Sequence, residues 1–469
     1  MSARFLNILL GLLSLAGLAT ACLFMYQVIH YSSNAPIGND DIDLILIDTI
    51  AILKAQSFDE WLTPLLHQNA EHRPAMLRLL GLLSYITIGK ISLPFINIVS
   101  ASVLLFSLLA LLRSSSRSWK EMLWMAGWAI PLVVAPLHHE CLLWASCSAS
   151  HYTVIAFGCI GLLLALRTGW LAFIGFEIAC LLALLSLFSG LLVPLLGGLA
   201  IWWRPEQAEK KRTLLWMHAV ITLSSIGLYM VQLDLIYKYL PWEATIVGAS
   251  PSAAVWNALI WLCAWLGAWL DIGREIHAPN ILTQPIIDTP WFVACVGAAQ
   301  ILAILTVLWR SHRTLAKQYL HIRLMFVYLA CTIFVAAIQR SMILPFAYIF
   351  TSRYQLYTQW LVVCLLGLLL ILLRDNTKPD SNNKTDDNNK TDSNDTKFRM
   401  YTAALCMVSL MFYAATFKRF YQRPANTFVS QMACVKNWKT QGAAPDCWWH
   451  GDTKTKLDNI MSSNLFQMD

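Results

Sequence analysis

The sequence predicts an all-α polytopic membrane protein with about eleven transmembrane helices. Of its 469 residues, 57% are hydrophobic and only 13% are charged, against roughly 25% charged residues in soluble domains. The apolar residues form blocks of about 20, the length at which a helix crosses a hydrocarbon core of about 30 Å. No segment alternates with a period of two, which excludes an outer-membrane barrel. Backbone groups in lipid must bond within their own segment, so the blocks are predicted to be helices.

The predicted spans are 5–28, 91–112, 121–137, 148–166, 169–187, 190–203, 213–235, 290–309, 324–342, 355–373 and 400–416. The first apolar run is too long for a signal peptide, so we interpret it as a retained span. A further apolar segment, 254–271, is interpreted as a re-entrant or interfacial helix, because a crossing there would move a later basic cluster to the other side. The alternative is a full crossing paired with another short one.

The basic residues define the orientation. With this set of spans, Arg4 and three basic clusters, at 113–120, 204–212 and 310–323, fall on one side. The positive-inside rule makes that side cytoplasmic. We therefore expect a core of residues 1–374, a last span at 400–416, and an inner-membrane protein with a cytoplasmic N-terminus. The cations are scattered over short loops, which excludes a nucleic-acid partner.

The segments outside the spans have distinct characters. The cytoplasmic connection 375–399 is almost entirely polar and is predicted to be disordered. The first loop, 29–90, is extracytoplasmic, and the apolar periodicity of residues 42–52 favours a helix lying along the membrane surface. The tail, 417–469, is extracytoplasmic too. In that compartment Cys434 and Cys447 are expected to form a disulfide.

The first loop is rich in ionisable residues. Near a bilayer, such a cluster suggests a polar cavity. A carboxylate from Asp40, Asp41 or Glu71 could deprotonate an acceptor hydroxyl, Arg73 could hold a phosphate, and His72 could bind a phosphate or protonate a leaving group. The alternative is a loop with ordinary surface charges. The other ionisable residues of the loop include Asp43, Asp48, Asp59, Glu60, His67 and Arg78.

A second polar cluster follows the third span and contains His138, His139, Glu140, Trp144 and His151. Three histidines and a glutamate could bind a divalent metal ion. On a helix, however, adjacent residues such as His138 and His139 point about 100° apart, which hinders shared coordination. A polar, capped loop end is the alternative.

A third cluster joins the last spans before the polar connection. Arg340, Arg353 and Tyr354 lie on the predicted extracytoplasmic side. Two arginines there run against the positive-inside bias, and binding of a phosphate or pyrophosphate would explain them. A structural ion pair with a loop carboxylate is the alternative.

In order, these elements resemble bacterial multi-pass glycosyltransferases of the GT-C type, over residues 1 to 375. Asp40-Asp41 resembles the acidic pair that follows the first span in that family. Asn69-Ala70-Glu71-His72-Arg73 resembles its H-N-E-H-R motif, with Ala70 interrupting the pattern. Pro136 to Trp144 resembles a P-L-x-x-E-N-x-x-W signature with Cys141 in place of asparagine, and Arg340 with Ser352-Arg353-Tyr354 resembles R…S-R-Y-x-x-P without its proline. The paired-cysteine tail is also similar.

The resemblance implies a periplasmic site that a polyprenyl-phosphate sugar enters from the lipid. Arg73, Arg340 or Arg353 would hold its phosphate, with His72, His138, Glu140, Trp144 and Tyr354 in the same site, and a first-loop carboxylate would activate the acceptor. Fixed cations would stabilise the charge that builds on the leaving phosphate. The acceptor would be a glycan, a lipopolysaccharide or a secreted protein such as a pilin.

Three other functions compete with a transferase. A transporter or flippase of lipid-linked glycans often has internal repeats and mid-membrane polar sites, and the sequence has no clear repeat. A polysaccharide polymerase or ligase usually has its large loop late in the chain, whereas here it comes first. A membrane scaffold without chemistry is the last alternative.

Overall fold

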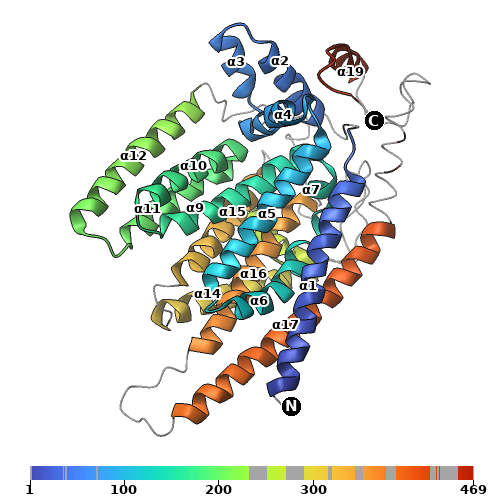
Figure 1. Ribbon diagram of the computed structural model, residues 1–469. Helices are drawn as coiled ribbons and strands as arrows, with labels where there is room; N and C mark the ends of the chain where they lie inside the picture. Colours follow the sequence, from blue (N-terminus) through green and yellow to red (C-terminus); the bar gives the residue numbers. More distant parts are fainter. Residues whose placement is uncertain are drawn as a thin grey trace. The chain divides into compact units, whose positions relative to one another are not determined.

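The fold is all-helical throughout the part of the chain that the computed structural model describes (Figure 1). The described residues are 3–34, 36, 40–69, 72–231, 251–270, 290–314, 319–343, 352–375, 387–422, 429, 433 and 453–467. Their only β-type pairings are two isolated bridges. The chain divides into two compact units. Unit 1 comprises Met1–Cys22, Leu109–His138 and Lys238–Phe417, and unit 2 comprises Leu23–Leu108, His139–Tyr237 and Lys418–Asp469.

Nine helical segments in the described residues are long and apolar enough to cross a membrane. They are α1 (Ala3–Tyr31), α5 (Leu93–Ser115), α6 to α7 (Trp119–Leu143), α8 to α9 (Ala145–Ala165), α12 (Ala208–Met230), α14 (Pro290–Thr314), α15 (Leu320–Ile343), α16 (Ser352–Asp375) and α17 (Asp387–Gln422). Each coincides with a span that the sequence predicts. The chain is therefore a multi-pass membrane protein.

The other two of the eleven predicted spans correspond to shorter helices. They are α10 (Trp170–Ser186) and α11 (Leu192–Trp202), joined by a 3-10 turn at Phe188–Leu191. At the turn, a Cβ on Gly190 would lie 2.0 Å from the carbonyl oxygen of Ala183. Only glycine allows this approach, which lets the chain reverse immediately after α10. Of the eleven predicted spans, nine thus coincide with candidate membrane-spanning helices in the described residues.

Helix α13 (Pro251–Gly267) corresponds to the segment that was predicted to be re-entrant or interfacial. It packs against α14 and α15. Trp261 and Trp265, in its C-terminal half, are buried, whereas Val255 and Trp256 near its start are exposed. Helix α13 therefore has a buried half, unlike a helix that only rests on a membrane surface.

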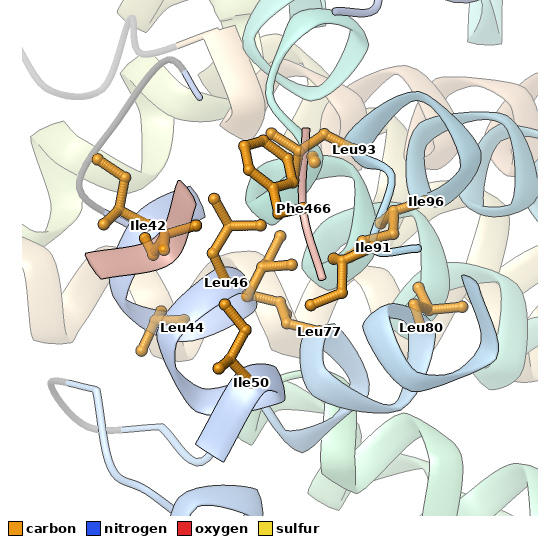
Figure 2. Packing of buried hydrophobic residues seen from close by; sticks show 14 of the residues in the cluster. Ile42, Leu44, Leu46, Ile50, Leu77, Leu80, Ile91, Leu93, Ile96 and Phe466 are labelled. Carbon is orange, nitrogen blue, oxygen red and sulfur yellow. The ribbon is translucent and has the colours of Figure 1, made fainter. Parts of the chain in front are cut away.

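The first loop folds into four short elements of unit 2. They are a π-helical segment η1 (Asp41–Ile47), α2 (Asp48–Lys54), α3 (Phe58–Leu65) and α4 (Ala75–Ile88). The helix predicted from the periodicity of residues 42–52 is present. Its apolar side chains, such as Ile42, Ile45 and Ile50, are buried against residues of α4 and the start of α5 (Figure 2). These side chains thus face a protein core, whereas the sequence suggested a membrane surface.

The tail returns to this core. Helix α19 (Thr453–Ser462) packs on η1, and Phe466 lies among the apolar side chains of the first loop (Figure 2). The ammonium of Lys456 lies 3.0 Å from the carboxylate of Asp43, and the backbone N–H of Ile91 donates to the carbonyl oxygen of Leu465 over 2.9 Å. Segments in direct contact lie on one side of a membrane. If α1 crosses, the total number of crossings is odd, a condition that both nine and eleven satisfy.

We expect reporter fusions to place the first loop and the tail on one side and the α16–α17 connection on the other. Alkaline phosphatase fused after residue 40 or residue 469 should be active, and phosphatase fused after residue 380 should be inactive. A fusion after residue 189, between α10 and α11, distinguishes eleven crossings (active) from nine (inactive). Opposite results for residues 40 and 469 would contradict the contact between the first loop and α19.

One prediction about the polar connection needs correction. Residues 375–399 were expected to be disordered, but α17 begins at Asp387, inside this segment. A helix nucleated by the apolar residues that follow can extend toward its N-terminus, because each added residue contributes one hydrogen bond. An acid such as Asp387 is also favourable in the first turn of a helix.

Candidate functional site

Arg73 is the predicted site residue with the most unusual surroundings. It follows a tight turn in which Asn69 and His72 exchange two backbone hydrogen bonds of 2.8 and 2.9 Å. Its backbone N–H donates to the hydroxyl of Tyr229 over 3.0 Å. Its guanidinium donates to the carbonyl oxygen of Val231. The turn and the end of α12 thus fix Arg73 at both its backbone and its side chain.

The guanidinium of Arg73 is buried without a counter-ion in the described residues. The residue is 6% exposed, none of the described carboxylates pairs with it, and its Nε has no hydrogen-bond partner among them. Burial lowers the pKa of Arg73, an effect that the nearby Tyr229 partly opposes. Burying an uncompensated charge is costly. An anion bound at this point would therefore stabilise the site.

The predicted acids have unequal surroundings. Asp41 is 1% exposed, and its Oδ1 accepts a hydrogen bond of 2.9 Å from the backbone N–H of Ser146. It therefore anchors the start of α8 (Ala145–Cys147), and the catalytic role of Asp41 stays a prediction. Asp40, directly before η1, is exposed. Glu71 lies outside the described residues.

The bond from Asp41 brings the first and second predicted clusters together within unit 2. Ser146 lies two residues after Trp144, which is half-buried, and the backbone N–H of Trp144 donates to the carbonyl oxygen of Glu140 over 2.8 Å. Glu140, in α7 (His139–Leu143), is half-buried as well. The structure thus places Asp41 beside Ser146, two residues after Trp144.

His138 is buried inside unit 1. Its Nδ1 lies 2.8 Å from the side-chain oxygen of Gln359, whose amide nitrogen donates to the carbonyl oxygens of Leu132 and Ala135 over 2.9 and 3.2 Å. With 0% of its surface exposed, His138 joins α6 to α16 through Gln359, and its contact with substrate stays a prediction.

The predicted divalent metal finds no support. Within the described ranges, no group of three or more His, Cys, Asp or Glu side chains is arranged to hold an ion. The contact of His138 with Gln359 shows why, since it directs this imidazole to α16 while the next residue, His139, begins α7.

The third predicted cluster lies in unit 1. Arg340 is half-buried near the end of α15, and Arg353 is half-buried at the start of α16. The guanidinium of Arg353 lies 5.5 Å from the ring centroid of Tyr354. Tyr354 is buried, and its ring centroid lies 4.7 Å from that of Trp265 in α13. That these arginines join Arg73 around one ligand stays a prediction. Cys434 and Cys447 lie outside the described residues.

The sequence analysis did not predict two sets of buried polar contacts. In the first loop, Asp48 pairs with Arg78 and His67. Among α10, α11 and α12, the Nδ1 of His218 lies 2.8 Å from a carboxylate oxygen of Glu177, and its Nε2 lies 2.9 Å from the carbonyl oxygen of Pro194. The signal was present in both cases, because Arg78 and Glu177 stand inside otherwise apolar runs. Charges at such positions are usually paired and often functional.

A scan against protein-family models found no match, and a search of curated proteins found none either. The resemblance to GT-C glycosyltransferases therefore rests on the motifs alone. The geometry adds an all-helical multi-pass membrane protein in which Arg73, in the H-N-E-H-R-like motif, is buried and has no carboxylate partner among the described residues.

Proposed function

We propose that the protein is a membrane glycosyltransferase of the GT-C type, which moves a sugar from a polyprenyl-phosphate donor to an extracytoplasmic acceptor. The observation that supports it best is the buried guanidinium of Arg73, which has no carboxylate partner in the described residues. A polyprenyl phosphate offers an anion for such a cation and an apolar chain that lies in the bilayer. A bacterial inner membrane, with the site on the periplasmic face, fits this chemistry.

In this reaction the acceptor oxygen bonds to the anomeric carbon while the bond from that carbon to the phosphate oxygen breaks. The phosphate leaves with the electron pair, and its charge grows in the transition state. Arg73 would stabilise that charge from a fixed position, with Arg340 and Arg353 as further candidate cations. Asp40 and Glu71 are the candidate acids for taking the acceptor proton. A glycan, a lipopolysaccharide or a secreted protein would supply the acceptor hydroxyl.

Replacing Arg73 by alanine is expected to weaken binding of undecaprenyl phosphate, the product common to undecaprenyl-phosphate sugar donors. Loss of a hydrogen-bonded charge contact of about 1.5–3 kcal/mol corresponds to a roughly 10- to 100-fold increase in Kd. Native mass spectrometry or thermal shift of the protein in lipid nanodiscs would measure it. Arg73→Lys should lose less than alanine, because it keeps the charge without the planar fork.

Lys54→Ala is the matched control, since Lys54 is an exposed cation in the same loop. Its Kd should equal that of the wild-type protein. Inorganic phosphate as a competitor distinguishes recognition of the headgroup from recognition of the apolar chain. An unchanged Kd in Arg73→Ala would remove the support for the proposal.

A transporter or flippase of lipid-linked glycans is the second candidate, and the Glu177–His218 pair favours it. Both side chains are buried, and α12, which carries His218, is long enough to span. In proteoliposomes, a flippase would move fluorescent polyprenyl phosphate between leaflets without forming a glycosidic bond, and Glu177→Gln would slow that movement. Such movement without transfer would replace the transferase proposal.

A further inference from the structure

The first loop contains a buried ion pair between Arg78 and Asp48, and the same guanidinium also donates to a backbone carbonyl oxygen. Arg78, in α4, is 0% exposed. Its Nε and Nη2 lie 2.9 and 2.8 Å from Oδ2 of Asp48, at the start of α2. Its Nη1 donates to the carbonyl oxygen of Leu65, over 3.1 Å. Leu65 ends α3 and precedes His67 by two residues, so one guanidinium fixes both Asp48 and the segment that carries His67.

The imidazole of His67 completes this group and reaches solvent. Its Nδ1 lies 3.3 and 3.1 Å from the two carboxylate oxygens of Asp48. The side chain of His67 is 55% exposed, whereas that of Asp48 is 9% exposed. Of the two neutral tautomers, a carboxylate at this distance selects the one with hydrogen on Nδ1, which leaves the lone pair of Nε2 for a proton. A base oriented by a fixed third group is the arrangement that activates hydroxyl nucleophiles.

The same turn that presents Arg73 also presents His67. His67 precedes Asn69 by two residues, and Arg73 directly follows His72, while Asn69 and His72 are held together by their two backbone hydrogen bonds. The imidazole and the buried guanidinium therefore belong to the two arms of one tight turn. His67 and Arg73 thus flank a segment whose ends, Asn69 and His72, are hydrogen-bonded to each other.

From this geometry we infer that His67, in place of Asp40 or Glu71, is the catalytic base of the proposed glycosyl transfer, with Asp48 as its positioning residue. This inference rests on the proposed function. Nε2 of His67 takes the proton of the acceptor hydroxyl, whose oxygen bonds to the anomeric carbon. The bond from that carbon to the phosphate oxygen breaks, and the phosphate leaves with its electron pair toward Arg73. Asp48 holds Nδ1–H and stabilises the imidazolium that forms.

The first test measures whether His67 lies at the phosphate site, and it requires no turnover. Full-length protein in nanodiscs is treated with diethyl pyrocarbonate, and carbethoxylation of each histidine is followed by peptide mass spectrometry. Saturating undecaprenyl phosphate should slow modification of His67 but not of His30, an exposed histidine at the end of α1. If the lipid binds and His67 reacts at an unchanged rate, the inference is wrong.

The second test measures the chemistry with undecaprenyl-phosphate hexoses as donors and release of undecaprenyl phosphate as the readout. A general base contributes about 10²–10⁴-fold, so His67→Gln should lower kcat by that factor and leave the Kd for undecaprenyl phosphate unchanged. Asp48→Asn should also lower kcat, because His67 would lose the carboxylate that orients it. Added imidazole should restore part of the rate to His67→Gly, which a purely structural role would not allow.

The outcomes separate the two proposals. Full turnover in His67→Gln would overturn the assignment of the base and leave the transferase intact. Failure of the wild-type protein to bind undecaprenyl phosphate would overturn the proposed function itself, and this inference with it. The wild-type protein could bind the lipid but release none from the hexose donors tested. In that case slower modification of His67 in the first test would support the inference, and an unchanged rate would contradict it. Lys54→Ala again serves as the control, with unchanged binding and kcat.

Discussion

Replacing Arg78 by leucine is expected to lower the free energy of unfolding by about 3–5 kcal/mol, because Asp48 would stay buried without its cation. Burial lowers the pKa of Arg78, and the charge of Asp48 acts against that change. Asp48→Leu should cost a similar amount by leaving the guanidinium unpaired. Thermal unfolding can be followed with a thiol-reactive dye, since Cys159, Cys180 and Cys406 are buried until the helices separate.

The double variant Asp48→Leu/Arg78→Leu supplies the decisive comparison. Apolar residues of similar volume often replace a buried ion pair at little cost, so the double variant should recover most of the lost stability. It should not recover turnover, because His67 would lack its orienting carboxylate. Asp59→Leu, at an exposed position of the same loop, should change stability by no more than about 0.5 kcal/mol. Wild-type stability in Arg78→Leu would show that the pair does not support the fold.

The spanning helices could be predicted because they depend on length and composition alone. A run of about 20 apolar residues has one stable arrangement in lipid, and nine predicted spans match helices of the structure. The shorter helices α10 and α11 were harder to classify, because 17 and 11 residues lie at or below the crossing length. Both helices pack against α9, so protein contacts account for part of their apolar composition.

The sequence of the first loop could not predict whether its apolar side chains face lipid or protein. The periodicity of residues 42–52 indicates a helix with apolar side chains on one side, but an apolar face packs equally well on lipid or on protein. The partners that decide, Leu457, Ile460 and Phe466, follow more than four hundred residues later in the chain. No local signal connects the two segments. The same holds for Lys456, the cation that pairs with Asp43.

The candidate site shows the same limit. Residue type and motif selected Arg73 as a candidate phosphate-binding cation, and the structure shows that this residue is buried. It could not tell that Asp41 caps the backbone of Ser146 or that His138 contacts Gln359, because both roles depend on non-local partners. Arg78 carried a usable signal, since a guanidinium within an apolar helix needs a buried partner. That partner, Asp48, lies 30 positions earlier, so only the fold identifies it.

The second large effect is expected from Gly297→Ala, where α13 and α14 approach most closely. A Cβ on Gly297 would lie 1.7 Å from the carbonyl oxygen of Cys263, and one on Gly267 would lie 1.9 Å from that of Val293. Backbone atoms cannot move aside as a flexible side chain can, so the two helices must separate. Small residues allow this kind of close contact between membrane helices. We expect overpacking to destabilise the protein by about 3 kcal/mol, the upper part of its usual range.

Helix propensity alone would make Gly297→Ala stabilising, because alanine is the better helix former by about 1 kcal/mol. A loss of stability would therefore report the steric clash. Gly11→Ala in α1 is the matched control, since a Cβ there would meet nothing within 4 Å. It should leave the thermal midpoint unchanged or raise it, whereas Gly297→Ala should lower it. Separation of α13 and α14 would also weaken the hydrogen bond of 3.1 Å from Trp269 to Gln300 and raise the maleimide reactivity of Cys263. Equal thermal midpoints for the two variants would show that α13 and α14 tolerate a wider spacing. The close contact at Gly297 would then not be what holds α13 within unit 1.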